Sequence, residues 1–294
     1  MDRTGTEHLP NSKISRRTTE VQDSKIWTSP GGVLGELVQS SVARARELRP
    51  SAAAIRSRAR AMSAPPAFGE ALKGENVAVI AEVKRASPSK GVIRPDLDIS
   101  AQCSAYERGG AAAISVLTEP SRFGGSLEDL AAARAACGRP ILRKDFIVDE
   151  IQIAEARAAG ASAVLLIARA LAPAKLAELL AATTENGLSA LVEIRNHAEL
   201  ETALRIGAAI IGVNNRNLET LEMDDRAQSL LPHIPRACTA VAESGYRTRA
   251  DVMRAADAGA DAVLIGSELS GSLAPQALLA ELVSATRNVD ARPN

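Results

Sequence analysis

The stretch from residue 161 to residue 214, ASAVLLIARALAPAKLAELLAATTENGLSALVEIRNHAELETALRIGAAIIGVN, decides the fold. Three short apolar runs in it, AVLLIA, SALVEI and AIIGVN, alternate with two amphipathic segments of helical period. Each amphipathic segment ends on a glycine, Gly187 or Gly207, which suits the left-handed end of a helix. Uninterrupted apolar runs that alternate with helices indicate parallel strands buried on both faces.

The same strand-and-helix unit recurs from Val77 to the C-terminus. Three apolar runs precede the quoted stretch, VAVIAEVK, AAISVL and PILRKDF, and two follow it, TAVAES and AVLIGS. The predicted strand ends fall near Lys84, Leu117, Lys144, Ile167, Glu193, Asn214, Glu243 and Gly266, at spacings of 33, 27, 23, 26, 21, 29 and 23 residues. Eight such units predict an α/β fold, the (β/α)8 TIM barrel. An open doubly wound sheet is disfavoured, because the KRASPSKG that follows the first strand is not a dinucleotide-binding fingerprint.

The chain divides into three segments. Residues 1–32 are polar and end in a Ser-Pro-Gly-Gly breaker cluster, so we expect a disordered tail. Residues 33–72 form a helical extension, with apolar positions at helical spacing and an Arg-rich outer face up to about Met62. Residues 73–294 form the barrel, which we expect to be the catalytic domain.

Composition narrows the class of ligand. Lys+Arg and Asp+Glu balance at 35 each and aromatics make up 2% of the chain, which argues against a nucleic-acid partner. The three cysteines and three histidines show no metal-ligand spacing, so we expect no metal. No apolar run reaches the ~20 residues of a membrane span, and the N-terminus lacks the apolar core of a secretory signal. We therefore expect a cytoplasmic protein with a small-molecule partner.

Charged residues gather at the predicted strand ends, where TIM barrels carry their chemistry. Side chains two apart on a strand point the same way, which pairs Glu82 with Lys84 on the first strand and Lys144 with Phe146 on the third. Four more polar residues follow the fifth, sixth and seventh strands: Glu193, Asn214, Arg216 and Glu243. The alternative interpretation is a structural ion-pair network or the first solvated residue of each loop. Glu82 is the hardest of these residues to explain as a solvated loop residue, because it lies inside an apolar strand, where an unpaired carboxylate would be costly.

Glycine-rich turns after the last two strands indicate a phosphate site. Glu243-Ser244-Gly245 and Gly266-Ser267 stand where such barrels bind phosphate through backbone N–H groups and a helix N-terminus. The segment Ser87–Gly91, with its hydroxyls and Lys90, is a third candidate for contact with an anion. Taken alone, each of these segments is equally an ordinary turn or loop.

Seven ordered motifs between about Val33 and Leu282 carry a family resemblance. They are AEVKRASPSKG, SVLTEPSRFGGS, LRKDFIVDEIQI, LVEIRNHAEL, IIGVNNRNLETLEMD, VAESGYRT and DAVLIGSEL. The chain resembles the indole-3-glycerol phosphate synthase family, whose barrel carries an extra packed N-terminal helix. The resemblance implies a carboxy-lyase of tryptophan biosynthesis. Its substrate would be 1-(2-carboxyphenylamino)-1-deoxyribulose 5-phosphate, and its products indole-3-glycerol phosphate, CO2 and water.

The resemblance also implies residue roles. Lys144 matches the general acid toward the substrate's ketone oxygen. Lys84 matches the lysine that contacts the anionic substrate and takes part in dehydration, with Glu193 as acid/base partner and Glu82 orienting Lys84 or the ring nitrogen. Asn214 and Arg216 match groups that position and stabilise intermediates. The matching binding positions are Ser87, Phe123, Phe146, Glu243, Ser244, Gly245, Leu264, Gly266 and Ser267.

Three further expectations concern chemistry and assembly. Loss of CO2 restores aromaticity, so no cofactor is expected. A lysine beside another cation is expected to have a depressed pKa, which would let it act as an acid. Arg143 departs from the family's usual small residue or cysteine, but strand parity turns it outward. We expect a monomer or a weak homo-oligomer. The alternatives are a phosphoribosylanthranilate isomerase, a non-catalytic barrel, and a paralogue in a specialised pathway.

Overall fold

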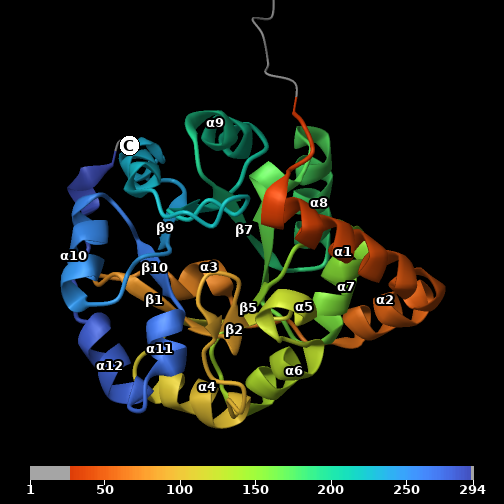
Figure 1. The fold of residues 1–294 in the computed structure, drawn as a ribbon, viewed down its shortest axis with the longest axis horizontal. Helices are drawn as coiled ribbons and strands as arrows, with labels where there is room; N and C mark the ends of the chain where they lie inside the picture. Colours follow the sequence, from red (N-terminus) through yellow and green to blue (C-terminus); the bar gives the residue numbers. More distant parts are fainter. Residues whose placement is uncertain (1–26, 293–294) are drawn as a thin grey trace, which may run out of the picture.

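The computed structural model describes residues 27–292, apart from the side chain at position 226. Most of the predicted tail, residues 1–26, therefore lies outside the described residues. Eight parallel strands close into a barrel in the order β1-β10-β9-β8-β7-β6-β5-β4, and helices surround them as a ring (Figure 1). The strands are β1 Ala78–Val83, β4 Ala113–Leu117, β5 Ile141–Lys144, β6 Ala163–Ile167, β7 Ser189–Ile194, β8 Ile210–Asn214, β9 Thr239–Glu243 and β10 Ala262–Ile265. The predicted TIM barrel is confirmed.

Burial on both strand faces explains the uninterrupted apolar runs. Every residue of β4, β6, β8 and β10 is buried. One set of alternating side chains fills the barrel interior, and the other set packs beneath the helices. The strands pair in parallel, so their C-terminal ends, and the polar residues placed there, meet at one mouth.

The strand connections carry the outer helices. These are α4 Ile99–Arg108, α6 Leu127–Ala136, α7 Glu150–Ala158, α8 Pro173–Glu185, α9 His197–Arg205, α10 Arg249–Asp257 and α12 Pro275–Leu282. Between β8 and β9 the connection is instead a 3-10 helix, η3 Asp225–His233, which contains Pro232. Proline has no N–H to donate and disfavours a regular α-helix there. None of the helices within residues 27–292 is long and apolar enough to cross a membrane.

Polar side chains begin several of the outer helices. Ser126, Asp149 and Thr248 each form a capping box, in which the cap and the third helical residue satisfy each other's backbone N–H groups. Positive φ angles at Gly187 and Gly207, 69° and 81°, fit the predicted left-handed helix ends. The capping boxes begin helices on the mouth side of the barrel, and the glycines end helices at the opposite side, just before the next strand.

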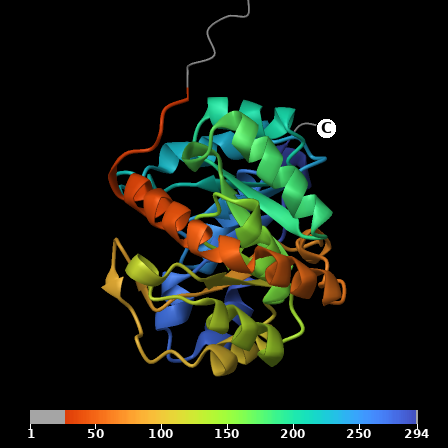
Figure 2. The ribbon, with the colours of Figure 1, turned by 90° about the vertical axis from the view of Figure 1, so that its right-hand side faces the viewer.

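The N-terminal extension is helical, as predicted, but it is not one continuous helix. Its elements are α1 Gly32–Leu48, the 3-10 turn η1 Arg49–Ser51, α2 Ala52–Ala61 and the short α3 Phe68–Ala71. Pro50 explains the break, since it can open a new helical turn but not continue the old one. Ile55 and Ala59 of α2 pack against Ile151 and Ala154 of α7, and Figure 2 shows α1 and α2 lying in sequence along the outside of the barrel.

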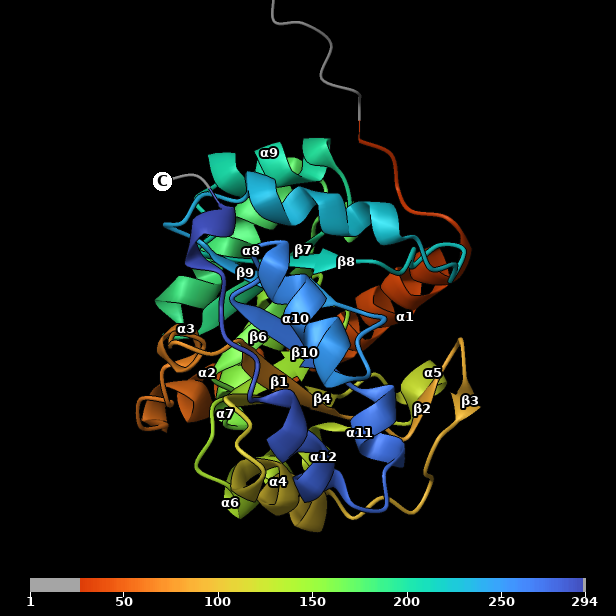
Figure 3. The ribbon, with the colours of Figure 1, turned by 90° about the vertical axis from the view of Figure 1, so that its left-hand side faces the viewer.

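Several short helices and one hairpin lie in the loops around the mouth of the barrel. They are the hairpin β2 Ala86–Ser87 with β3 Gly91–Val92, α5 Pro120–Phe123, η2 Ala168–Ala170 and α11 Ser267–Gly271. Figure 3 shows the hairpin and α5 projecting at one end of the barrel, the end at which α1 also lies. One further 3-10 turn, η4 Val289–Ala291, lies near the C-terminus. The mouth is therefore built from loops on several strands and from α1.

Candidate active site

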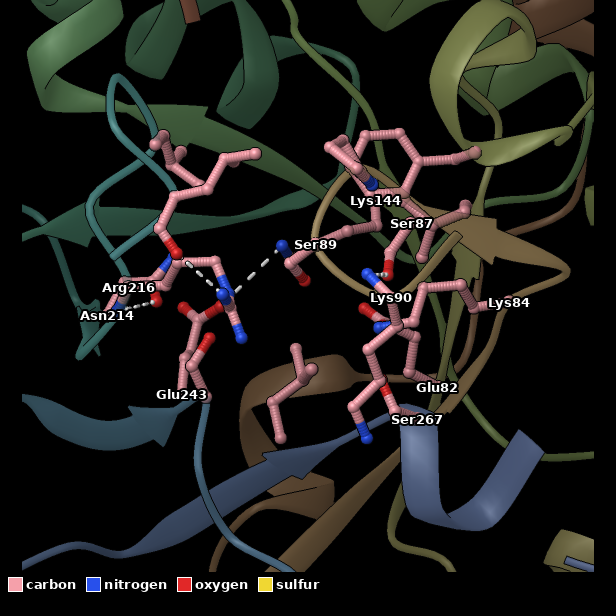
Figure 4. A pocket seen from close by; sticks show the side chains of 18 of the residues that line it. Glu82, Lys84, Ser87, Ser89, Lys90, Lys144, Asn214, Arg216, Glu243 and Ser267 are labelled. Atoms are coloured by element: carbon pink, nitrogen blue, oxygen red, sulfur yellow. Dashed lines mark hydrogen bonds and ion pairs between the residues drawn. The ribbon is translucent and has the colours of Figure 1, made fainter. Parts of the chain in front are cut away.

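A cavity of about 160 Å³ opens at the C-terminal ends of the strands (Figure 4). The predicted site residues that line it are Glu82, Lys84, Ser87, Phe123, Lys144, Phe146, Asn214, Arg216, Glu243, Ser244, Gly245, Leu264, Gly266 and Ser267. The exception is Glu193, which lines a neighbouring cavity. Strand parity thus identified the inward side chains correctly, but it did not separate the two cavities.

Glu82 and Lys84 form a buried ion pair at the end of β1. Lys84 Nζ donates to Glu82 Oε1 at 2.7 Å, and Ser115 Oγ lies 3.4 Å from Glu82 Oε2. Burial alone would raise the pKa of Glu82, but the charges of Lys84 and Lys144 outweigh it and hold that pKa below its ordinary value. Gly266 makes room for this pair, because a Cβ at that position would overlap the Glu82 carboxylate. The glycine predicted for phosphate therefore also admits the ion pair.

Lys144 projects from the end of β5 into a group of carboxylates. Its Nζ lies 3.7 Å from Glu193 Oε2 and 3.7 Å from Glu243 Oε2. Burial would lower the pKa of Lys144, but the negative charges of Glu193, Glu243 and Glu82 raise it well above its ordinary value. The expectation of a depressed lysine pKa is therefore wrong. The nearest charges to this ammonium are carboxylates of other strands, so it is protonated at neutral pH.

The carboxyl of Glu243, in contrast, is held in its neutral form by its surroundings. It is 1% exposed at the end of β9, and burial together with the neighbouring charge of Glu193 raises its pKa to about 8, against the attraction of Lys144. Two carboxylates beside one ammonium cannot both ionise freely, so the pair holds a proton near neutral pH. Gly212 of β8 leaves the space for Glu243, because a Cβ there would overlap its carboxylate. The site thus contains both a charged ammonium and a stored carboxyl proton.

Asn214 and Arg216 form the wall between β8 and its loop. Asn214 Oδ1 accepts from the backbone N–H of Arg216 at 2.9 Å, and Arg216 Nη1 donates to the carbonyl of Leu221 at 2.8 Å. Burial, and secondarily the charge of Arg247, lowers the pKa of Arg216. The guanidinium remains a strong cation, so this wall offers a positive charge and amide hydrogen bonds to an anionic ligand.

The turns predicted for phosphate line the cavity, and the first of them has left-handed backbone angles. Ser244 and Gly245 follow β9 with φ angles of 65° and 93°, a left-handed conformation that is costly for the serine. Gly266 precedes α11, which Ser267 begins, as the sequence suggested for a short extra helix. In the third candidate segment, Lys90 lines the same cavity and pairs with Glu268 at 3.0 Å.

Apolar side chains also line the cavity. The rings of Phe123 and Phe146 stand 6.3 Å apart between centroids, and Leu264 lines the same cavity. Val33 and Leu37 of α1 complete this wall. The sequence did not reveal either residue as part of the site, because helical periodicity shows that a residue is buried but not which cavity it faces.

Comparison with known proteins identifies the family. The family model described as indole-3-glycerol phosphate synthase matches residues 36–282. The chain belongs to the indole-3-glycerol phosphate synthase family. The synthase of Mycolicibacterium gilvum is 50% identical over 251 residues, covering 85% of this chain and 92% of the relative. The synthase of Mycobacteroides abscessus is 46% identical over 261 residues, covering 87% and 96%. The predicted family, and with it the carboxy-lyase of tryptophan biosynthesis, is confirmed.

Solved structures of other proteins share the fold alone. A thiamine phosphate pyrophosphorylase from Pyrococcus furiosus aligns with a TM-score of 0.53 at 15% identity, covering 71% of this chain and 94% of that one. A structure titled native KDPGal aligns at 0.52 with 17% identity, covering 72% and 95%. Within residues 27–292, no group of three or more His, Cys, Asp or Glu side chains could hold a metal ion.

Asp145 and its hydrogen-bond partners are a further part of the synthase site that the sequence did not reveal. Asp145 follows Lys144 and is 1% exposed. Arg44 of α1 donates two hydrogen bonds to its carboxylate at 2.8 and 3.1 Å, and Arg143 donates one at 3.0 Å. Thr118 adds a fourth at 2.7 Å. Burial alone would raise the pKa of Asp145, but the arginines hold it well below its ordinary value.

Asp145 and Ser41 fix the backbone of Phe146 in the apolar wall. Asp145 Oδ1 accepts from the backbone N–H of Phe146 at 2.8 Å, and Ser41 Oγ of α1 donates to the carbonyl of Phe146. Arg143 is turned away from the cavity, as strand parity predicted, and it donates to the carbonyl of Gln152 in α7 at 2.8 Å. The N-terminal extension is thereby bonded to the loop that carries Lys144 and Phe146.

Proposed function

We propose that this chain closes the indole ring of 1-(2-carboxyphenylamino)-1-deoxyribulose 5-phosphate with Lys144 as the proton donor. The observation that carries the proposal is the ammonium of Lys144, held 3.7 Å from Glu193 and from Glu243 beside an apolar wall. A protonated lysine in a partly dry site can give up its proton to an oxygen that gains negative charge. The products are indole-3-glycerol phosphate, CO2 and water.

Substrate orientation follows from the two halves of the cavity. The phosphate binds the N–H groups of the turns at Ser244-Gly245 and Gly266-Ser267, with Ser87 on the facing hairpin. The carboxyphenyl ring lies against Phe123, Phe146 and Leu264. Fixing both ends of the substrate brings the ring carbon toward the ketone, and such orientation supplies a large part of a rate enhancement.

Ring closure comes first in the proposed sequence. Lys144 protonates the ketone oxygen while the ring carbon that bears the carboxylate attacks the ketone carbon. The carbon–carboxylate bond then breaks, CO2 leaves, and the electron pair restores the aromatic ring. Asn214 and Arg216 stabilise the charges that develop at this wall. No external electron acceptor takes part, since the ring itself receives the electrons.

Dehydration follows on the β1 side. Lys84, positioned by its 2.7 Å bond to Glu82, contacts the anionic substrate and transfers a proton as the hydroxyl leaves. Glu193 is the acid/base partner, and Glu243 joins it in sharing a proton beside Lys144. A proton is lost from the carbon next to nitrogen, and the indole is complete.

Turnover of the carboxyphenylamino substrate, followed by indole fluorescence, tests the activity. We expect the purified chain to turn over, and Lys144→Ala to lower kcat by roughly 10²- to 10⁴-fold while KM changes little. Absence of turnover by the wild type contradicts the synthase activity. An unchanged kcat in Lys144→Ala removes this lysine as the donor.

The predicted partners and location are part of the same proposal. We expect a cytoplasmic enzyme that binds a small phosphorylated substrate and no nucleic acid, as a monomer or weak homo-oligomer; light scattering measures the last point. The alternative activity, that of a phosphoribosylanthranilate isomerase, is expected to need a catalytic cysteine and an aspartate. Among the described residues, neither Cys103, Cys137 nor Cys238 lines the cavity.

A further inference from the structure

A second cavity lies behind the wall of the active site. Its volume is about 140 Å³, and it shares Ile167, Asn214, Arg216 and Leu218 with the main cavity as common wall residues. Glu193 lines this cavity, which we call the side chamber. The carboxylate therefore reaches Lys144 on one side and a separate space on the other.

The outer wall of the side chamber comes from the end of β7 and the start of α9. Arg195, Asn196 and Glu199 line it, and Asn196 is exposed on the protein surface. Glu199 accepts from the backbone N–H of Arg195 at 2.7 Å and from Asn196 Nδ2 at 2.7 Å. The chamber thus runs from a buried carboxylate to a polar rim at the surface.

One buried polar atom on a residue that lines the chamber, Arg195 Nε, has no hydrogen-bond partner within residues 27–292. Glu193, 3% exposed, also lines the chamber, and its Oε2 lies 3.7 Å from the ammonium of Lys144. Buried polar groups are ordinarily satisfied by protein or by ordered water. A polar cavity larger than about 10–15 Å³ with two or more polar partners holds water. A buried, unpartnered donor on a polar chamber of this size, which the Glu193 carboxylate also lines, suits a short chain of water molecules.

The proposed reaction creates a need for such a chain. The ketone oxygen takes up two protons before it leaves as water, and the carbon next to nitrogen loses one. The carboxylate departs as CO2 without contributing a proton, because it is ionised at neutral pH. One proton must therefore enter the site from solvent in each turnover, while substrate fills the main cavity.

We propose that the side chamber is a water-filled passage through which Glu193 takes up this proton from solvent. The proposal rests on the synthase function. In each cycle a water proton passes to the Glu193 carboxylate, which returns it to Lys144 at 3.7 Å, and the water chain is recharged at the surface rim beside Asn196. The passage lets the enzyme recover its proton without opening the main cavity.

The charges around Glu193 support a proton relay. The charged side chains that line the chamber or interact with Glu193 are Lys144 of β5, Arg169 of η2, Arg195 after β7, Glu199 of α9, Arg216 and Glu219 after β8, and Glu243 of β9. The two outer arginines have their own carboxylates, Arg169 with Glu219 at 2.9 Å and Arg195 with Asp224 at 3.2 Å. Burial, and less strongly the charge of Glu193, raises the pKa of Glu199 above its ordinary value.

Two variants of the chamber wall test the passage. Arg195→Met removes the unpartnered donor and makes the wall apolar. Glu199→Gln keeps the size of the side chain and one of the two hydrogen bonds that Glu199 accepts, but it cannot carry a proton. Arg205→Met and Glu201→Gln are matched controls, since both side chains are exposed on α9 and line neither cavity. For each variant, kcat and KM are measured in H2O and D2O, with and without imidazole as a small proton donor, beside a thermal melt.

We expect Arg195→Met to lower kcat by about tenfold, less than the 10²- to 10⁴-fold of a direct acid–base group, and Glu199→Gln to act in the same direction. KM should stay within about twofold, the solvent isotope effect on kcat should rise, and imidazole should restore the rate. The loss should deepen as pH rises, because solvent then supplies fewer protons. A merely structural change would not respond to imidazole.

An unchanged kcat and isotope effect in both chamber variants would overturn the passage. So would a loss of kcat that imidazole does not restore, or an equal loss in the controls. These results are separate from failure of the proposed function, in which the wild-type chain itself gives no indole product. Glu199→Gln keeps the test decisive where Arg195→Met lowers the melting temperature.

Discussion

Replacing Arg44 by methionine should show how strongly α1 supports the active site. Arg44 reaches Asp145 with two hydrogen bonds, at 2.8 and 3.1 Å, and the Asp145 side chain is 0% exposed. A hydrogen bond to a charged group contributes about 1.5–3 kcal/mol, and removing one partner of a buried pair costs about 3–5 kcal/mol. Arg143 still neutralises Asp145 in the variant, so we expect a loss of about 2–3 kcal/mol in the free energy of unfolding.

The assay is thermal and urea unfolding of Arg44→Met, with Arg49→Met as the control. Arg49 lies on the same helical extension but is 69% exposed and pairs with Asp149 at only 3.3 Å. An exposed pair of this kind contributes about 0–1 kcal/mol. For a chain of this size, the Arg44 loss should lower the melting temperature by about 5 °C. Equal losses in the two variants would refute the reasoning.

The pH dependence of the Arg44 effect has a definite sign. The folded-state pKa of Asp145 lies below its unfolded value, so its contribution to stability is present above the unfolded pKa and is lost as pH falls through the folded one. The difference between wild type and Arg44→Met should therefore be full at neutral pH and shrink below about pH 4. Because Asp145 also holds the Phe146 backbone, kcat/KM should fall several-fold.

Two further substitutions test the crowded centre of the site. Gly266→Ala places a methyl group against the Glu82 carboxylate and Lys84 Nζ, so kcat should fall by at least about tenfold with the fold intact. The control is Gly69→Ala, whose added Cβ meets Ile210 at an ordinary 3.5 Å and should leave the kinetics unchanged. Equal kinetics for the two alanine variants would contradict the crowding argument. Glu243→Gln should flatten the pH dependence of stability: the folded carboxyl has its pKa raised to about 8, so wild-type stability falls as pH rises from about 4 to 8, and the glutamine cannot lose a proton. Parallel stability curves for wild type and Glu243→Gln would show that this carboxyl is not held protonated.

The sequence was sufficient to predict the barrel, because its signal is local and repeated. Each strand is an unbroken apolar run, and each helix has a cap or a glycine end within its own segment. The β8 to β9 connection, whose helix is 3-10 and contains Pro232, lacks that signal. In the N-terminal extension, Pro50 separates α1 from α2 inside an otherwise helical pattern, and apolar spacing alone does not mark that boundary.

The sequence predicted which side chains point into the barrel mouth, but not which contacts they make there. Parity placed Glu82 and Lys84 on one side because the strand period is fixed. It could not show that Glu193 lines a second cavity, since that depends on side-chain packing between strands. The pKa error for Lys144 has the same origin, because its nearest charges come from β7 and β9. Arg44 and Asp145, 101 residues apart, share no local pattern at all.

The division of labour between Lys144 and Lys84 is the central claim, and a single turnover measures it most directly. CO2 release and indole fluorescence are recorded in the same reaction for Lys144→Ala and Lys84→Ala. Lys144→Ala should slow both signals equally, because ring closure precedes loss of CO2. Lys84→Ala should release CO2 ahead of indole fluorescence, because dehydration alone is delayed. Prompt CO2 release by Lys144→Ala, or equal slowing of both signals in Lys84→Ala, would contradict the account.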